Sequence, residues 1–265
     1  MKYTAGGAPR KFDVNCSILF TDLPLLERPA AAKAAGFDAV EFWWPFGEDP
    51  TPADKDIDAF VSAIDNAGVE LIGLNFIDLI PTGRGLVSVP GEETRFRDNI
   101  DVAIGIAERT GCKALNALYG NRIAGEHAQR QDELALENLR LAAKAAQRID
   151  AIVLLEALNA YESPDYPIVS AAHAIKIIEE VGEPNLRFLC DLYHLARMDE
   201  NLTGVIDTWA RYIGHVQIAD SPGRGRPGTG ALDFDALYAA LDESGYEGYI
   251  GLEYKDPELD WEWIK

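Results

Sequence analysis

Four polar residues stand at the ends of four successive apolar runs in the second half of the chain. The runs are AIVLL, RFLC, HV and YIGL, and the residues that follow them are Glu156, Asp191, Gln217 and Glu253. If the runs are parallel strands of one barrel, their carboxyl ends share one face and bring the four side chains together. Three carboxylates at close range repel one another unless a cation neutralises them. Because the oxygens of Asp, Glu and Gln suit Mg²⁺ or Mn²⁺, the pattern predicts a divalent-metal site.

Two further residues near these runs are candidates to contact a substrate. His194 closes the segment DLYH, and Glu162 lies six residues after Glu156 in EALNAYE. His194 is either a hydrogen-bonded histidine between a strand and a helix or a substrate contact. Glu162 is either a surface charge or a substrate contact. For His215, in HVQIAD, we favour a structural position in the barrel interior.

Three arginines are candidates to bind an anionic substrate. Arg224 and Arg226 lie in the glycine-rich segment ADSPGRGRPGTG, and Arg84 lies in PTGRGLVSVPG. A guanidinium group donates paired hydrogen bonds to a carboxylate, so an arginine beside an acidic cluster can hold an anion there. Of the three, we favour Arg224.

The elements that must position these residues follow a repeated strand–helix pattern. Eight short apolar runs are continuous rather than alternating, as is typical of parallel strands covered on both faces. These strand candidates are residues 13–19, 39–43, 70–75, 114–118, 151–156, 187–191, 215–219 and 249–253. Between them, apolar residues recur at helical spacing in residues 23–35, 54–66, 92–109, 133–148, 168–181, 202–209 and 234–242.

Eight strands in strict alternation with helices predict a single closed (β/α)₈ TIM barrel with parallel strands, formed by residues 1–265. The length of 265 residues is close to the ~250 residues typical of this fold. No GxGxxG follows the first strand candidate, which argues against a dinucleotide-binding sheet. The longest loops, residues 76–91, 157–167 and 220–232, follow strands and therefore lie on the face where such barrels carry their sites.

Other polar and aromatic residues near the strand ends allow more than one interpretation. Trp43 and Trp44, in EFWWPF, could cap the barrel core, line the pocket or lie in a subunit interface. Asn75 and Asn116 could bind a polar ligand or simply end their strands.

The composition limits the classes of partner. The formal net charge of −20 opposes binding to nucleic acid or to an anionic membrane, although a small anionic substrate can still bind at local arginines. The N-terminal segment MKYTAGGAPRK has no apolar core of a secretory signal, so we expect a cytoplasmic protein. Cys16, Cys112 and Cys190 lie in apolar runs and are expected to be buried thiols. Whether the chain forms a homo-oligomer stays open.

At these residues the chain resembles the hydroxypyruvate isomerase family of the xylose-isomerase-like barrel superfamily. The resemblance covers almost the whole chain and runs through NCSILF, VEFWWPF, LNF, GRGLVSVPGEETRFR, LNALYG, EALN, DLYH, HVQIADSPGRGRPGTG and IGLEY. The segments RGLVSVPG and HVQIAD…PGTG are the most specific. The chain departs from the family pattern at Ala157, where proline is usual, and at Arg226 and Ala231, where glutamate is frequent. These departures leave the choice of substrate open.

The resemblance implies a metal-dependent aldose–ketose isomerase that acts on a small sugar acid, such as hydroxypyruvate, which would give tartronate semialdehyde, or 2-oxo-tetronate. It implies that Mg²⁺ or Mn²⁺ binds at the four predicted ligands and stabilises an enediolate. Glu156 and Glu253 would move a proton between neighbouring carbons. His194 would contact a substrate oxygen, and Arg224 the substrate carboxylate.

Three alternatives remain open from the sequence. The first is a ketose 3-epimerase with the same metal and glutamate pair, although such enzymes usually have histidine where Gln217 stands. The second is an AP-endonuclease-like enzyme, which the net charge and the scarcity of histidine oppose. The third is a barrel that binds a sugar acid without catalysis.

Overall fold

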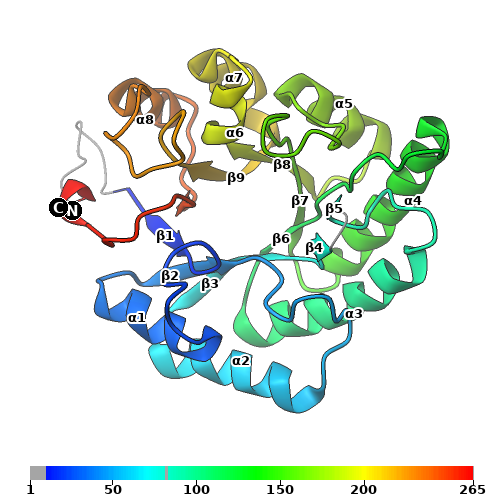
Figure 1. The fold of residues 1–265 in the computed structure, drawn as a ribbon, viewed down its shortest axis with the longest axis horizontal. Coiled ribbons are helices and arrows are strands. Elements are labelled where there is room, and N and C mark those ends of the chain that lie inside the picture. Colours follow the sequence, from blue (N-terminus) through cyan, green and yellow to red (C-terminus); the bar gives the residue numbers. More distant parts are fainter. Residues whose placement is uncertain (1–9, 81–82, 265) are drawn as a thin grey trace.

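Eight parallel strands form a closed barrel that the helices surround (Figure 1). The computed structural model describes residues 10–80 and 83–264, so residues 1–9, 81–82 and 265 of the predicted domain lie outside the described part. Around the barrel the strands run in the order β1, β2, β3, β6, β7, β8, β9 and β10, and β10 pairs with β1. This topology confirms the predicted (β/α)₈ barrel. The strands are β1 (Phe12–Asn15), β2 (Ala39–Phe42), β3 (Glu70–Asn75), β6 (Ala114–Asn116), β7 (Ile152–Glu156), β8 (Leu186–Asp191), β9 (Ile213–Ile218) and β10 (Ile250–Leu252).

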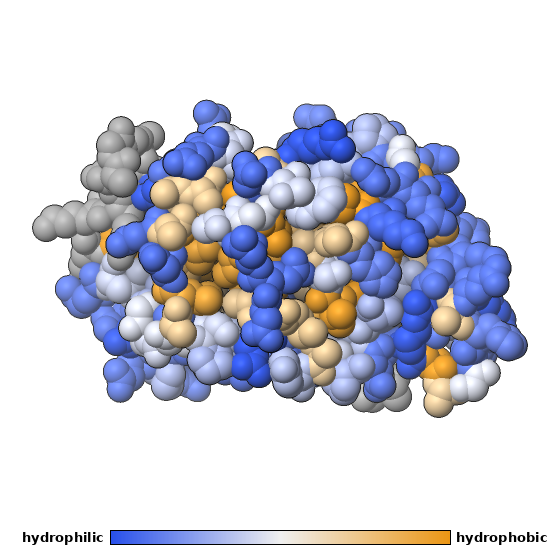
Figure 2. Space-filling view, turned by 90° about the horizontal axis from the view of Figure 1, so that it is seen from above, coloured by the Kyte–Doolittle hydropathy of each residue, from blue (hydrophilic) through white to orange (hydrophobic). Residues whose placement is uncertain are grey.

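The helices cover the outside of the barrel with their apolar faces. In α5, for example, Ala174, Ile175, Ile178 and Val181 are buried at helical spacing against the sheet. Figure 2 shows hydrophilic side chains over most of one side of the molecule, with apolar side chains between them. The helices are α1 (Arg28–Ala34), α2 (Asp54–Ala67), α3 (Glu93–Thr110), α4 (Ala128–Gln147), α5 (Ala171–Val181), α6 (Leu192–Arg197), α7 (Leu202–Trp209) and α8 (Phe234–Glu243).

The sequence-based boundaries are wrong at several elements. The strand predicted at 13–19 ends at Asn15, because the Asn15 carbonyl accepts hydrogen bonds from the amides of Ile18 and Leu19 and the chain turns there. The helix predicted at 133–148 begins earlier, at Ala128. The short helix α6, directly after Asp191, had no counterpart among the predicted helices.

The expectation about the three cysteines can be checked directly. Cys16, Cys112 and Cys190 are all buried free thiols, as predicted. Among the helices formed by residues 10–80 and 83–264, none is long and apolar enough to cross a membrane.

The loop after β3 contains two short antiparallel strands (Figure 1). Its strands are β4 (Leu79–Ile80) and β5 (Gly83–Arg84), and Leu79 pairs with Arg84. Gly85 follows with a positive φ of 83°. A Cβ at this position would lie 2.0 Å from the carbonyl oxygen of Leu118, so only glycine lets the loop approach the end of β6 this closely.

We expect Gly85→Ala to lower the free energy of unfolding by about 2–4 kcal/mol, because it adds a backbone collision to left-handed strain. Gly91→Ala is the matched control, since Gly91 has a φ of 89° but open space around its Cβ position. That variant should lose only about 1–2 kcal/mol, from strain alone. Chemical denaturation measures both values, and equal losses would contradict the close approach at Gly85.

Candidate active site

Glu156, Asp191, Gln217 and Glu253 lie together at the carboxyl ends of the neighbouring strands β7 to β10. Glu156 and Asp191 end β7 and β8, Gln217 is the fifth of six residues in β9, and Glu253 directly follows β10. None of the four is more than 5% exposed. One oxygen of each carboxylate and one ring nitrogen of His194 all lie within 4.8 Å of one another. The structure therefore contains a buried acidic cluster that could hold a metal ion.

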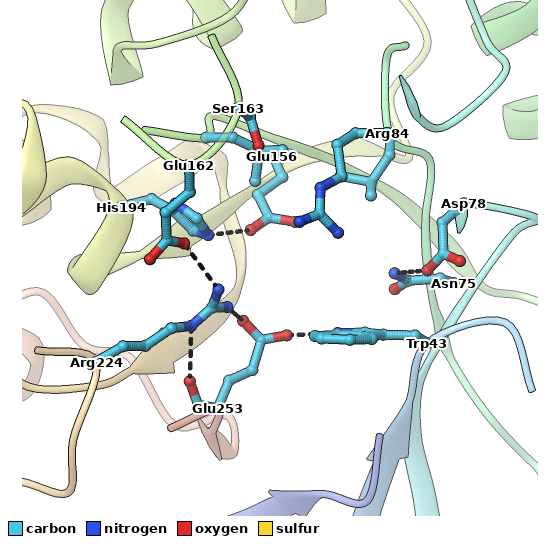
Figure 3. Close-up of a pocket in the computed structure, with 12 residues that line it drawn as sticks. Trp43, Asn75, Asp78, Arg84, Glu156, Glu162, Ser163, His194, Arg224 and Glu253 are labelled. Carbon is cyan, nitrogen blue, oxygen red and sulfur yellow. Dashed lines mark hydrogen bonds and ion pairs between the residues drawn. The ribbon is translucent and has the colours of Figure 1, made fainter. Parts of the chain in front are cut away.

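The cluster opens into a pocket at the mouth of the barrel (Figure 3). The pocket has a volume of about 450 Å³ when its open mouth is included. Glu156, Glu253 and His194 line it, and Figure 3 shows their polar groups directed into it. Its remaining wall carries Trp43, Asn75, Asp78, Arg84, Leu118, Leu158, Glu162, Ser163 and Arg224.

The carboxylates of the cluster disfavour one another's charge. Burial, followed by the negative charges of Glu253 and Asp191, raises the pKa of Glu156 well above its ordinary value. Burial, followed by the charge of Glu253, raises the pKa of Asp191 to about 8. Burial also raises the pKa of Glu253, although Arg224 opposes this shift. Because each negative charge disfavours the others, a cation bound among the three groups would stabilise their ionised forms, so the cluster suits a divalent metal.

Gln217 supports the same interpretation. Its side-chain nitrogen donates to an oxygen of Glu41 at 2.7 Å and more weakly to Glu253 at 3.4 Å. Its side-chain oxygen is buried and has no hydrogen-bond partner among residues 10–80 and 83–264. A buried amide oxygen without a partner is costly unless a ligand or ion occupies its lone pairs. With the three carboxylates it offers an oxygen donor set that fits Mg²⁺ or Mn²⁺.

The two glutamates are oriented by different donors. One oxygen of Glu253 accepts from the indole N–H of Trp43 at 2.7 Å and from the side chain of Asn15 at 3.0 Å. Glu156 accepts from the side chain of Asn116 at 2.9 Å. In each carboxylate, therefore, side-chain donors from other parts of the barrel orient at least one oxygen.

His194 presents an N–H group to the cluster rather than a lone pair. Its Nδ1 accepts a hydrogen bond from the backbone amide of Asn159 at 3.0 Å, so the neutral ring carries its proton on Nε2. Nε2 lies 3.6 Å from Asp191 and 4.0 Å from Glu156. Burial, followed by the charges of Arg224 and Arg84, lowers the pKa of His194 well below its ordinary value. The ring is therefore a neutral donor and is better suited to a substrate oxygen than to a metal.

Arg224 links the cluster to the rim of the pocket. Its guanidinium group lies 2.6 Å from Glu253 and 3.1 Å from Glu162, and it is stacked over the ring of Tyr193. Burial opposes ionisation of Glu162, but the hydrogen bond from Tyr193 and the charge of Arg224 outweigh it and lower the pKa of Glu162. The predicted substrate contacts Arg224 and Glu162 are thus paired with each other in the structure.

The loop that carries Arg224 is folded around one carboxylate. Asp220 is buried and accepts hydrogen bonds from the backbone amides of four residues, Ser221, Gly228, Gly230 and Leu232. These bonds hold residues 220–232 in a compact loop, in which the side chain of Arg224 is buried. The backbone carbonyl of Arg224 accepts a hydrogen bond from the amide of Lys255. A glycine-rich loop therefore presents a buried arginine in a fixed position.

Of the other residues considered from the sequence, some line the pocket and some lie outside it. Arg226 does not line the pocket and pairs with Asp260 at 3.2 Å, near the end of the described chain. Trp44 is buried and packs against Phe46, whereas Trp43 lines the pocket. His215 lies inside the barrel, as favoured from the sequence.

The sequence analysis did not identify the contribution of the first two strands. Asn15 from β1 and Glu41 from β2 are both buried, and they are hydrogen bonded to each other at 3.0 Å. Glu41 also lies 2.8 Å from Nε2 of His215 and accepts from Gln217. The available signal was a polar residue within or at the end of an apolar strand, Asn15 in FDVN and Glu41 in AVEF.

Comparison with known proteins places the chain in a family. Residues 29–264 match the model of the xylose isomerase-like TIM barrel family. A Streptomyces coelicolor protein provisionally named hydroxypyruvate isomerase is 58% identical, over 94% of this chain and 92% of its own length. The chain belongs to the hydroxypyruvate isomerase family. The Escherichia coli protein named hydroxypyruvate isomerase is 36% identical, over 92% of this chain and 93% of its own.

Two further similar proteins carry other functional names. The 2-oxo-tetronate isomerase of Haemophilus influenzae is 30% identical, over 95% of this chain and 97% of its own. A crystal structure described as AP endonuclease, family 2, from Brucella melitensis is 34% identical over 94% of both chains, with a TM-score of 0.84. The relatives named hydroxypyruvate isomerase or 2-oxo-tetronate isomerase are isomerases, and this chain is an enzyme of the isomerase class.

We expect Asp191→Asn to weaken Mn²⁺ binding by at least about 100-fold, since even the hydrogen-bond partners of metal ligands contribute about 10–100-fold. Asparagine keeps the shape of Asp191 and can still cap α6, whose amides at Tyr193 and His194 bond to it. Asp233→Asn is the matched control, because Asp233 caps α8 away from the cluster. Calorimetry on metal-stripped protein measures both affinities, and an equal effect of the two variants would contradict a metal site at Asp191.

Proposed function

We propose that this enzyme is a Mg²⁺- or Mn²⁺-dependent aldose–ketose isomerase of a small 2-oxo or 2-hydroxy acid, such as hydroxypyruvate or 2-oxo-tetronate. The observation that carries the proposal is the pair of buried glutamates, Glu156 and Glu253, which share one cluster but have separate hydrogen-bond partners. The names of the relatives at 30–58% identity support the substrate class.

The proposal assigns each polar residue of the cluster a role. Glu156, Asp191, Gln217 and Glu253 would ligate the metal. When bound, a divalent cation supplies positive charge that stabilises negative charge developing on substrate oxygens. The all-oxygen donor set favours Mg²⁺ or Mn²⁺ over zinc, which usually binds nitrogen or sulfur ligands.

Glu156 and Glu253 would carry out the proton transfer. In the isomerisation of hydroxypyruvate to tartronate semialdehyde, a proton leaves C3 and another reaches C2, while the hydroxyl proton on O3 is replaced by one on O2. One glutamate accepts the first proton and the other donates the second, so the composition of the substrate is unchanged. Burial raises the pKa of both carboxyl groups above its ordinary value, which favours the protonated form that one of them must adopt in each turnover.

The remaining pocket residues would bind and orient the substrate. The Nε2–H of His194, fixed by Asn159, would donate to a substrate oxygen. Arg224 and Glu162 form one ion pair in the wall of the pocket, and they would contact the hydroxyl and carbonyl groups of a bound acid. Because Arg224 also pairs with Glu253, it would couple substrate binding to the position of that carboxylate.

Glu253→Gln should lower kcat on hydroxypyruvate by about 10²–10⁴-fold, because the amide cannot exchange a proton with carbon. The change keeps the size of the side chain, so Mn²⁺ binding should persist with reduced affinity. Glu162→Gln is the comparison within the same pocket and should change kcat by less than about 10-fold, because the proposal gives Glu162 no proton to transfer. Full turnover by Glu253→Gln with metal bound would remove its catalytic assignment.

A substrate panel tests the reaction itself. With Mn²⁺ or Mg²⁺ added, the enzyme should isomerise hydroxypyruvate or 2-oxo-tetronate with a higher kcat/KM than it shows for fructose, tagatose or psicose. Activity restricted to the free ketoses would instead identify a 3-epimerase, which requires the same glutamate pair.

A further inference from the structure

The pocket contains two guanidinium groups, and only one of them is already neutralised. Arg224 lies between Glu253 and Glu162, at 2.6 Å and 3.1 Å, so two carboxylates balance its single positive charge. It is also no more than 9% exposed. A substrate carboxylate at Arg224, the contact that the family resemblance implies, would have to compete with both glutamates.

Arg84, in contrast, has no carboxylate paired with it among the described residues. Within residues 10–80 and 83–264 it forms no ion pair, although it lines the same pocket and is partly exposed. Figure 3 shows its guanidinium group directed into the pocket toward Glu156, from the opposite side to Arg224. The backbone around it is fixed by its pairing with Leu79 and by the close approach of Gly85 to Leu118.

The charges of the pocket favour such a group for binding an anion. Its wall carries four carboxylates, Asp78, Glu156, Glu162 and Glu253, against the two arginines. Asp78 is itself buried and accepts from the side chain of Asn75 at 2.6 Å. Even with a divalent cation bound at the cluster, these carboxylates and Asp191 together outnumber the positive charges, so a further cation without a protein counter-charge would favour the entry of an anionic substrate.

We propose that Arg84 binds the carboxylate of the substrate and makes the pocket selective for sugar acids over neutral sugars. This inference rests on the proposed isomerase function and deepens it. The substrate carboxylate is bonded to C2, one of the two carbons between which the proton moves, so it must lie close to Glu156 and Glu253. Arg84 points to that place, and a guanidinium group can donate two parallel hydrogen bonds to a carboxylate there.

The test compares an acid with its neutral counterpart. Dihydroxyacetone has a hydroxymethyl group in place of the carboxylate of hydroxypyruvate, and its isomerisation to glyceraldehyde moves a proton in the same way. Arg84→Gln should raise KM for hydroxypyruvate by about 10–100-fold, from the loss of a charge-assisted contact, and should leave kcat/KM for dihydroxyacetone within about 3-fold. Arg84→Lys should recover part of the affinity for the acid, because it keeps the charge but loses the planar fork.

Arg226→Gln is the matched control, since Arg226 lies in another loop and pairs with Asp256 and Asp260 outside the pocket. Its KM for hydroxypyruvate should equal that of the wild type. An unchanged KM in Arg84→Gln, or equal losses with acid and triose, would overturn the assignment.

The failure of the proposed function can be recognised separately. If the wild-type enzyme with Mn²⁺ turns over no hydroxypyruvate or 2-oxo-tetronate, the isomerase proposal fails. Calorimetric titration of hydroxypyruvate into wild type and Arg84→Gln then still tests the binding role. Weaker binding in the variant alone supports Arg84 as the carboxylate site, and equal binding, or none to either protein, overturns it.

Discussion

The repulsion among three buried carboxylates is the constraint on which the rest of the site depends. Glu156, Asp191 and Glu253 meet with His194 within 4.8 Å, and burial raises the pKa of each carboxyl group. A protein gains nothing from such an arrangement for stability alone, because buried like charges disfavour ionisation. The arrangement is useful only if a cation binds there or if protons move through it, and the proposed isomerisation requires both.

The residues around the cluster give its polar side chains different hydrogen-bonding states. Glu41 takes up the amide nitrogen of Gln217, which leaves the amide oxygen without a protein partner. Asn159 fixes His194 as a neutral donor. Arg224 lies between Glu253 and Glu162, so the acidic pocket holds one arginine inside its own network and leaves Arg84 on the opposite wall for an external anion.

The barrel and the acidic cluster could be predicted from the sequence because topology determines both. Parallel strands bring their carboxyl ends to one face, so Glu156 and Asp191 had to converge whatever the details of packing. The tautomer of His194 and the pairing of Arg224 could not be predicted, because each depends on contacts between segments that are remote in sequence. The helix boundaries were also missed: α4 begins at Ala128, after the extended backbone of His127, although the apolar spacing predicted a start at residue 133.

The origin of the proton that reaches C2 tests the two-glutamate account most directly. Hydroxypyruvate is isomerised in D₂O with Mn²⁺, and the product is followed by NMR beside an enzyme-free control for exchange. Because one glutamate removes the proton from C3 and the other delivers a solvent-derived one, the account predicts deuterium at C2 of tartronate semialdehyde from the first turnovers. Protium at C2 that came from C3, with no solvent label, would contradict it.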